Sequence, residues 1–215
     1  MSNQALITGK NSKVGLYLQW HGGMDSVAPF LEYASFHSSQ GLGEEVSDNG
    51  LATLVTIINN SMEFDSVYVV PVDPEELQEE DYLSGNENGV YVVDGDWNII
   101  QRIDAPEVEQ NCHDYATMLL TIDQTQPESM QLGEEFLNAK VIPTSEVEVG
   151  MTVFKKGILK KGILRWEKHK VQHIGNPTGD PVPQMFPENS PYTGEYPESN
   201  PNGYVLTETV RAIVD

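Results

Sequence analysis

The chain is short of several residue types, and each shortage excludes a class of protein. Only 12 lysines and arginines stand against 33 aspartates and glutamates among 215 residues, which gives a formal net charge of −21. A surface this acidic argues against direct binding to nucleic acid or anionic lipid, because both need clustered positive charge. The single cysteine, Cys112, excludes an intramolecular disulfide framework and a cysteine-rich zinc site.

Long apolar runs are also missing. No stretch reaches the roughly 18 residues that a membrane-spanning helix needs, and residues 1–13 lack the apolar core of a signal peptide. We therefore expect a cytoplasmic protein. The 39% hydrophobic content is nevertheless enough for a packed core, and the length fits one large domain or one domain with a smaller module.

Several secondary-structure elements can be predicted in the first half of the chain. Residues 14–20 form a β-branched and aromatic run that predicts a strand. Asp25 or Ser26 then caps a predicted helix whose apolar face is Val27, Phe30, Leu31 and Ala34. A second helix, capped by Ser47 or Asp48, carries its own apolar face, made of Leu51, Leu54, Val55, Ile58 and Met62.

More strands follow these helices. Residues 66–72 predict a strand, and 89–93 with 97–103 predict a β-hairpin around an Asp-Gly turn. Pro106 is expected to start a third helix with Cys112 on its apolar face. This order predicts an α+β fold in which two to three helices pack on a mixed or antiparallel sheet.

The second half has a different character. We divide the chain into an α+β domain at 1–126 and a small, mostly-β module at 127–215. Short strand-like runs lie at 141–149, 151–154 and 204–214, and residues 175–203 hold seven of the 13 prolines. Because proline cannot sustain a helix or a central strand, this stretch is expected to be an extended loop inserted into the module.

A glycine-rich segment lies between the first predicted strand and helix. Residues 22–26 read GGMDS and resemble the SGGxDS signature of the ATP pyrophosphatases, the PP-loop family, with His21 where that family has serine. In the family, the glycines let backbone N–H groups approach a pyrophosphate at a helix N-terminus. An alternative interpretation is a glycine turn followed by a helix cap. The resemblance implies nucleotide-contacting roles for Gly22, Gly23, Asp25 and Ser26.

A second resemblance is broader. Residues 14–27, VGLYLQWHGGMDSV, followed by Phe30-Leu31, are similar to the N-terminal pattern YLxWxGGxxSVxxFL of a largely uncharacterised family of small phage and prophage proteins. The later segments 50–55 and 88–93 are similar as well, so the resemblance covers roughly residues 12–104. It implies a phage origin, but it implies no activity and no residue roles.

The acids are concentrated in the middle of the chain. Residues 61–130 hold 17 acids and one base, Arg102. A short helix starting at Pro74 would put some of these acids at i, i+4 spacing on one face. Such a run is either a solvated face or an array that imitates the charge of a DNA backbone and occupies a basic nucleic-acid channel. The expected contacts are Glu75, Glu76, Glu79, Glu80 and Asp81.

No pattern in the sequence indicates catalysis or a bound metal. His169 and His173 are four residues apart on a predicted strand, where we interpret them as an exposed pair and not a chelate. Cys112 is expected to be a buried, inert thiol. We therefore assign no catalytic residue, no metal ligand and no cofactor.

These observations favour one hypothesis and leave two alternatives. The favoured hypothesis is a phage-encoded, non-enzymatic anti-defence inhibitor of the anti-CRISPR or anti-restriction type. As a DNA mimic it would block a basic nuclease or DNA-binding surface of a host protein or nucleoprotein complex, in the host cytoplasm. It would bind neither nucleic acid nor membrane directly, and a homodimer is an open alternative. The other two functions are a nucleotide-binding enzyme of the ATP-pyrophosphatase type and a phage structural or assembly protein.

Overall fold

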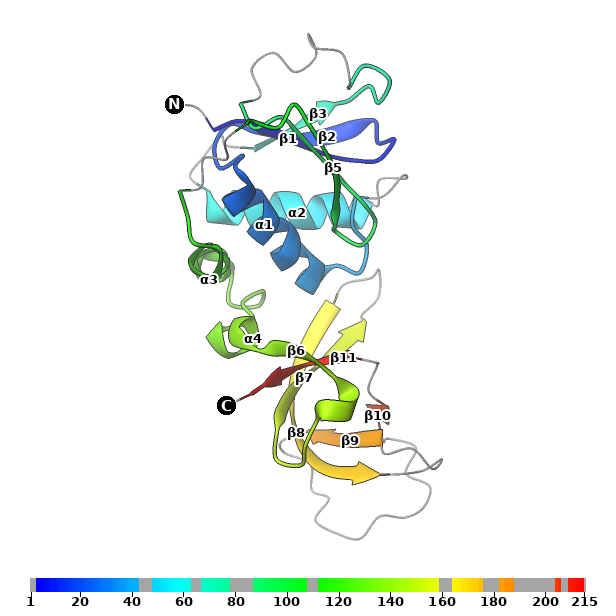
Figure 1. Cartoon of the computed structure of the whole chain (residues 1–215). Helices are drawn as coiled ribbons and strands as arrows, with labels where there is room; N and C mark the ends of the chain where they lie inside the picture. Colours follow the sequence, from blue (N-terminus) through cyan, green and yellow to red (C-terminus); the bar gives the residue numbers. More distant parts are fainter. Residues whose placement is uncertain are drawn as a thin grey trace. The chain divides into compact units, whose positions relative to one another are not determined.

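The chain forms two compact units in the computed structural model (Figure 1). The N-terminal unit comprises residues 1–131 with 158–164, and the C-terminal unit comprises 132–157 and 165–215. The predicted α+β fold class is confirmed, because helices pack on a mixed sheet in the first unit and strands dominate the second. The structure describes residues 3–42, 48–62, 67–77, 87–107, 112–158, 164–175, 182–187, 204–205 and 209–214.

A five-stranded mixed sheet organises the N-terminal unit, with strand order β3-β2-β1-β4-β5. The strands β1 and β4 pair in parallel, and the other neighbours pair antiparallel. The expected Asp-Gly hairpin is present between β4 and β5. The strand bounds are β1 Ala5–Gly9, β2 Val14–Leu18, β3 Val67–Pro71, β4 Val90–Val93 and β5 Ile99–Ile103.

The sequence analysis did not identify the central strand β1. All five of its residues are buried, because helices cover one side of the sheet and the segment 72–77 covers the other. On that second side Leu6 packs with Val72, Leu77, Val90 and Val92. A strand buried on both faces has no polar–apolar alternation, and five residues are too few to identify it by length.

Three helices belong to this unit: α1 (Met24–His37), α2 (Asp48–Ser61) and α3 (Tyr115–Thr125). Figure 1 shows α1 and α2 on one side of the sheet. The predicted apolar face of α1 is confirmed, since its four residues are at most 2% exposed. The predicted cap is wrong, because Gly23 is the N-cap residue and makes no side-chain cap bond, so Asp25 and Ser26 lie inside the first turn.

The third helix starts nine residues later than predicted. Its N-cap is Asp114, whose carboxylate accepts a hydrogen bond from the Thr117 backbone N–H, at 3.0 Å. Cys112 therefore precedes the helix and is exposed, which corrects the expectation of a buried thiol. Within the described ranges, no helix is long and apolar enough to cross a membrane.

The C-terminal unit is built on a sheet of order β10-β9-β8-β7-β11-β6, in which β9 pairs antiparallel with β8 and β10, and β11 pairs antiparallel with β6 and β7. Its core includes Val147, Val153, Val171 and Val210. Phe136 packs against Phe154 and Trp166 at centroid distances of 5.1 and 4.8 Å. The bounds are α4 Glu134–Asn138, β6 Lys140–Pro143, η1 Thr144–Glu146, β7 Thr152–Ile158, β8 Leu164–Gly175, β9 Val182–Pro187, β10 Tyr204–Val205 and β11 Thr209–Ile213.

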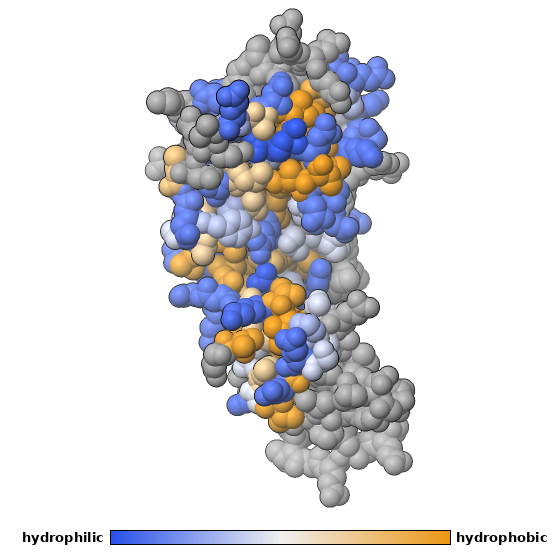
Figure 2. All heavy atoms as spheres, in the orientation of Figure 1, coloured by the Kyte–Doolittle hydropathy of each residue, from blue (hydrophilic) through white to orange (hydrophobic). Residues whose placement is uncertain are grey.

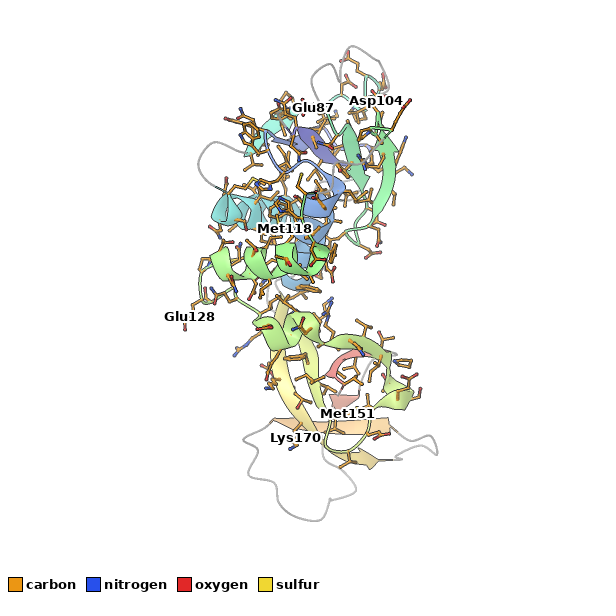
Figure 3. All side chains as sticks on the ribbon, turned by 60° about the vertical axis from the view of Figure 1, so that its left-hand side comes forward. Glu87, Asp104, Met118, Glu128, Met151 and Lys170 are labelled. Atoms are coloured by element: carbon orange, nitrogen blue, oxygen red, sulfur yellow. The ribbon has the colours of Figure 1, made fainter. Side chains whose placement is uncertain are left out.

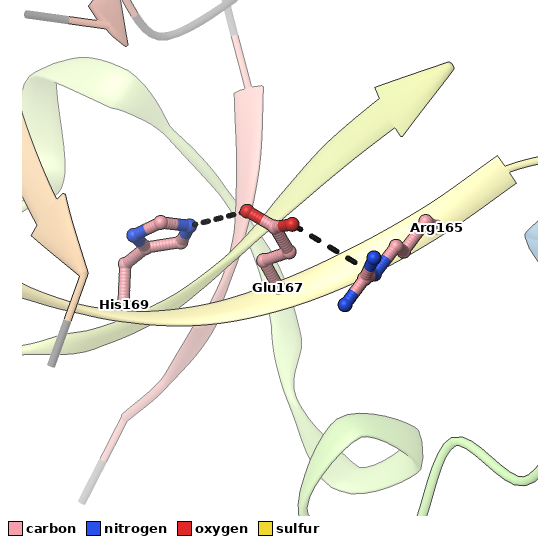
Figure 4. A network of polar contacts seen from close by, with 3 residues as sticks. All are labelled: Arg165, Glu167 and His169. Carbon is pink, nitrogen blue, oxygen red and sulfur yellow. Dashed lines mark ion pairs between the residues drawn. The ribbon is translucent and has the colours of Figure 1, made fainter. Parts of the chain in front are cut away.

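Two expectations for this unit are corrected. The proline-rich stretch 175–203 contains a strand, β9, which pairs with both β8 and β10, so its prolines do not prevent sheet pairing there. His169 is not part of an exposed pair, because its side chain is 2% exposed and its Nε2 lies 3.6 Å from Glu167, which in turn lies 3.8 Å from Arg165. Figure 4 shows these three residues following one another along β8.

Candidate functional site

The glycine segment between β2 and α1 is tied closely to the start of the chain. The Gly22 backbone N–H donates to the Asn3 carbonyl at 2.7 Å, and the Tyr91 hydroxyl donates to the Gly22 carbonyl at 2.9 Å. A Cβ atom at Gly22 would lie 2.6 Å from the Asn3 oxygen and 2.7 Å from Ala5. Glycine is therefore required here by close backbone approach. The Gly23 carbonyl accepts the N–H groups of Ser26 and Val27.

Asp25 joins this segment to a part of the chain almost 90 residues away. Its carboxylate is 7% exposed, and its Oδ2 accepts the backbone N–H groups of Cys112 and His113 at 2.5 and 2.8 Å. Ser26 is completely buried, with its hydroxyl 3.5 Å from Asp25 Oδ1. Both side chains thus have partners inside the protein, and Asp25 fixes the loop that leads into α3.

A small group of titratable side chains gathers at this junction. The rings of His21 and His113 stack at a centroid distance of 5.5 Å and an angle of 23°. Burial lowers the pKa of His21, and the neighbouring His113 lowers it further, while Asp25 acts in the opposite direction. Cys112 lies beside them in sequence and is exposed. No group of three His, Cys, Asp or Glu side chains suited to a metal occurs among the described residues.

This geometry bears on the four residues that the ATP-pyrophosphatase resemblance selects. They are contiguous between a strand and a helix, as the motif requires. However, the Gly22 N–H, the Gly23 carbonyl and the Asp25 carboxylate are all engaged within the chain. Those contacts favour a structural joint, in which the glycines admit close packing and Asp25 anchors a loop.

The acidic residues expected to contact a partner are described only in part. Glu75 and Glu76 are exposed in a turn that follows β3, where the Asp73 carboxylate accepts the Glu75 N–H at 3.0 Å. The buried Leu77 ends the described part of this turn. The helix predicted from Pro74 is not present in the described residues 74–77, which form turns. Glu79, Glu80 and Asp81 lie outside the described residues.

The sheet places eight of the eleven described acids of residues 61–130 at its two ends. The strands β1, β3 and β4 all finish at one end of the sheet, which we call the Asp94 end. We call the opposite end, where β5 finishes, the Asp104 end. Strands of four or five residues separate them, or roughly 13–17 Å at about 3.3 Å per residue. The Asp94 end carries Asp73, Glu75, Glu76, Asp94 and Asp96, together with Lys10 and Lys13, and the Asp104 end carries Glu87, Asp104 and Glu107.

Most of these carboxylates are exposed. Between residues 61 and 130, nine of the eleven described acids are exposed, Asp94 is half-buried and Asp123 is buried. Figure 3 shows Glu87 and Asp104 near one another, while Glu128 lies in a different region of the unit. Since the distance between the two ends exceeds the Debye length of about 8 Å in physiological salt, the ends act as separate charge clusters.

The only base in this region is held by the sheet. One Arg102 Nη atom donates to the Asn88 carbonyl at 2.7 Å, and its guanidinium lies 4.0 Å from the centre of the Tyr91 ring. Burial alone would raise the pKa of Asp94, but hydrogen bonds from Asn98 and Asp96 outweigh it and lower the pKa. The Asp94 turn therefore keeps its negative charge at neutral pH.

A hollow of about 400 Å³ adjoins the Asp94 end, between α1 and the β4–β5 turn. Glu32 and Asp96 contribute carboxylates to its wall, and Trp97 lines it while donating its indole N–H to the Ser38 carbonyl at 3.0 Å. The Tyr115 hydroxyl donates to Glu32. The described lining of the hollow thus contains two acidic side chains and no basic one.

Sequence reasoning did not identify the apolar groups that remain on the surface. Figure 2 shows apolar residues among hydrophilic ones on the visible face of the N-terminal unit. Tyr68 and Val69 of β3 are 43% and 57% exposed, and Trp20, just after β2, is 45% exposed. A strand pattern predicts pairing but does not show which strand lies at the edge, so this exposure could not be foreseen.

Comparison of the chain with protein families, with curated proteins and with solved structures found no match.

Proposed function

We propose that this chain is a non-enzymatic inhibitor that binds the basic surface of a nucleic-acid-binding protein through exposed carboxylates of its N-terminal unit. In this proposal it is a phage-encoded anti-defence protein of the anti-CRISPR or anti-restriction type, and it acts as a DNA mimic in the host cytoplasm. The observation that carries the proposal is the exposure of nine carboxylates within residues 61–130, a stretch of sequence whose only base, Arg102, bonds to the protein itself.

The physical basis is complementarity between opposite charges. A basic nucleic-acid channel attracts a dense set of fixed carboxylates as it attracts phosphates, and rigid loops hold those carboxylates without a large ordering cost. The Asp73–Leu77 turn is fixed by its own hydrogen bonds and by the burial of Leu77. Glu75 and Glu76 thus form the contact pair that can be tested most directly.

The test compares two variants with the same change in charge. Glu75→Lys/Glu76→Lys reverses the proposed contact, and Glu146→Lys/Glu148→Lys reverses two exposed acids of the C-terminal unit. We expect the tagged wild-type chain to capture a nuclease or DNA-binding protein from host lysate, and added duplex DNA to displace it. The first variant should lose this capture and the second should keep it.

Two results would contradict the proposal. One is equal capture by both variants after circular dichroism has shown that both are folded. The other is a captured partner that DNA does not displace, because a DNA mimic and DNA itself should compete for the same surface of the partner.

A second candidate is a nucleotide-binding enzyme of the ATP-pyrophosphatase type, favoured by the position of Gly23 as the N-cap of α1 after a strand. Its test is a thermal-shift measurement with ATP and magnesium. This candidate requires that ATP and magnesium raise the melting temperature of the wild-type chain. The increase should be absent in Gly23→Ala and present in Gly95→Ala. No stabilisation of the wild-type chain would rule it out.

A further inference from the structure

Among the described strands, β3 is an edge strand of the N-terminal sheet. Within the described strands its only neighbour is β2. Two of its hydrophobic side chains, Tyr68 and Val69, are 43% and 57% exposed. An exposed apolar edge strand is a ready template for pairing with another extended segment.

The hydrogen-bond register shows which backbone groups face outward. The Val72 N–H donates to the Lys13 carbonyl at 2.9 Å, so the Val72–Lys13 pair bonds toward β2. In an antiparallel ladder, bonded and non-bonded pairs alternate. Following the register back, Val70 and Tyr68 also bond toward β2, whereas Val67 and Val69 direct their N–H and C=O groups away from it.

The usual protection of such an edge is confined to one end. Proteins block edge strands with lysine, proline or a bulge. After Val67 and Val69, the next residue of β3 whose backbone faces away from β2 is Pro71, which has no N–H group to donate. The strand β3 contains no charged residue. The stretch Val67–Val69 is therefore left able to accept a short added strand.

The surroundings of the edge select a basic occupant. Asp73, Glu75 and Glu76 are exposed just beyond Pro71, and Tyr68 packs beside Tyr17 at a centroid distance of 6.3 Å. Carboxylates attract lysine and arginine, and tyrosine rings bind such cations over their faces. A second copy of the chain is disfavoured, because each copy carries a net charge of −21 and like charges repel.

We propose that the outer edge of β3 is the docking site for an extended basic segment of the partner, which adds to the sheet as a sixth strand. Backbone hydrogen bonds at Val67 and Val69 supply the pairing, and Asp73, Glu75 and Glu76 select the charge. This inference rests on the proposed function, since it names the mode by which the acidic unit holds a basic protein.

The test uses a defined probe, a synthetic peptide of alternating lysine and valine, with the corresponding glutamate–valine peptide as control. Val69→Pro removes one outward N–H and leaves the bonds to β2 in place, while Val69→Thr keeps the N–H and the branched shape. We expect the lysine peptide alone to bind, Val69→Pro to weaken binding at least tenfold, and Val69→Thr to change it less than about threefold.

A measurement on the wild-type chain keeps the test decisive if Val69→Pro does not fold. Amide hydrogen exchange followed by NMR should show new protection at Val67 and Val69 when the lysine peptide is added. Unchanged exchange at both residues would overturn the inference, as would equal binding of the glutamate peptide or dimerisation of the chain through this edge. If Glu75→Lys/Glu76→Lys releases the cellular partner but Val69→Pro does not, strand addition fails while the proposed function stands.

Discussion

Single buried polar groups fix the joints of the N-terminal unit. Asp25 holds the loop before α3 through two backbone N–H groups. Tyr33 plays a comparable part, because its hydroxyl donates to Asp123 at 2.7 Å and lies 2.9 Å from the Met130 carbonyl. Burial and the bond to Asp123 raise the pKa of Tyr33. Hydrogen bonds to charged groups contribute more than neutral ones, so these positions should be sensitive to isosteric change.

The first prediction concerns Asp25. Asp25→Asn removes the charge from the group that both backbone N–H groups bond to, and its N–H₂ group then faces either those two donors or the Ser26 hydroxyl. The free energy of unfolding should therefore fall by about 1–3 kcal/mol. Asp96→Asn, at an exposed carboxylate, should change it by less than about 0.5 kcal/mol. Urea denaturation measures both. Equal stability of the two variants would contradict the anchoring role of Asp25.

The second prediction concerns His37, the last residue of α1, whose buried Nε2 has no hydrogen-bond partner among the described residues. Burial lowers the pKa of His37 to about 4, although Asp123 acts in the opposite direction. Between this value and the ordinary pKa near 6.5, the unfolded chain binds more protons than the folded one. Stability should therefore rise with pH across this window, by up to about 3 kcal/mol from His37.

His21 contributes in the same direction, since its pKa is also lowered, so a variant is needed to separate the two histidines. His37→Gln cannot titrate in this window, and we expect its unfolding free energy to rise less steeply from pH 4 to pH 6.5 than that of the wild-type chain. Chemical denaturation at several pH values gives both slopes. Identical slopes would show that His37 does not titrate as its burial requires.

At the scale of elements, helical apolar spacing and a turn signal predicted structure, whereas the buried strand β1 was missed. The apolar spacing of α1 and the Asp-Gly hairpin signal both predicted the observed structure. The strand β1 was missed because burial on both faces removes alternation. The start of α3 was misplaced because Pro106 is a strong helix-start signal, whereas the observed cap depends on the Asp114 contact with Thr117.

The candidate site was likewise predicted only in part from the sequence. The sequence selected Gly22, Gly23, Asp25 and Ser26 as a group, and they are contiguous at the start of α1. Their partners at residues 3 and 112–113 are far away in sequence. No local pattern specifies such contacts, so the chemistry of the group could not be predicted from the motif.

The third prediction tests the joint between β2 and α1. Gly22→Ala would force a Cβ against backbone atoms at 2.6–2.7 Å, and overpacking of this kind costs about 1–3 kcal/mol. Gly95→Ala is the matched control, because a Cβ there meets nothing within 4 Å. Thermal denaturation should show a clear loss of stability for Gly22→Ala only. A Gly22→Ala protein as stable as the control would mean that the joint can relax.

At the scale of the whole molecule, composition predicted the acidity but not its arrangement. The 17 acids of residues 61–130 were expected to form either a solvated face or one anionic array, whereas eight of the eleven described ones lie at the two ends of a sheet. Strand direction decides this: β3 and β4 both finish at the Asp94 end, so Asp73, which follows β3, lies at that end, whereas Glu87, which precedes β4, lies at the other. Each end is then a separate cluster for a partner to recognise, and the β3 edge, with Glu75 and Glu76 beside it, belongs to the Asp94 end.

The most direct test of the account is the salt dependence of binding to the captured partner. Glu75→Gln/Glu76→Gln and Asp104→Asn/Glu107→Gln each remove two exposed charges, one pair from each end. Between about 50 and about 300 mM salt, the wild-type dissociation constant should rise steeply, because screening weakens attraction between opposite charges. The Glu75→Gln/Glu76→Gln variant should have a higher dissociation constant that depends less on salt. The Asp104→Asn/Glu107→Gln variant should show smaller changes in both quantities. A dissociation constant that salt leaves unchanged, or that neither pair alters, would contradict recognition through these carboxylates.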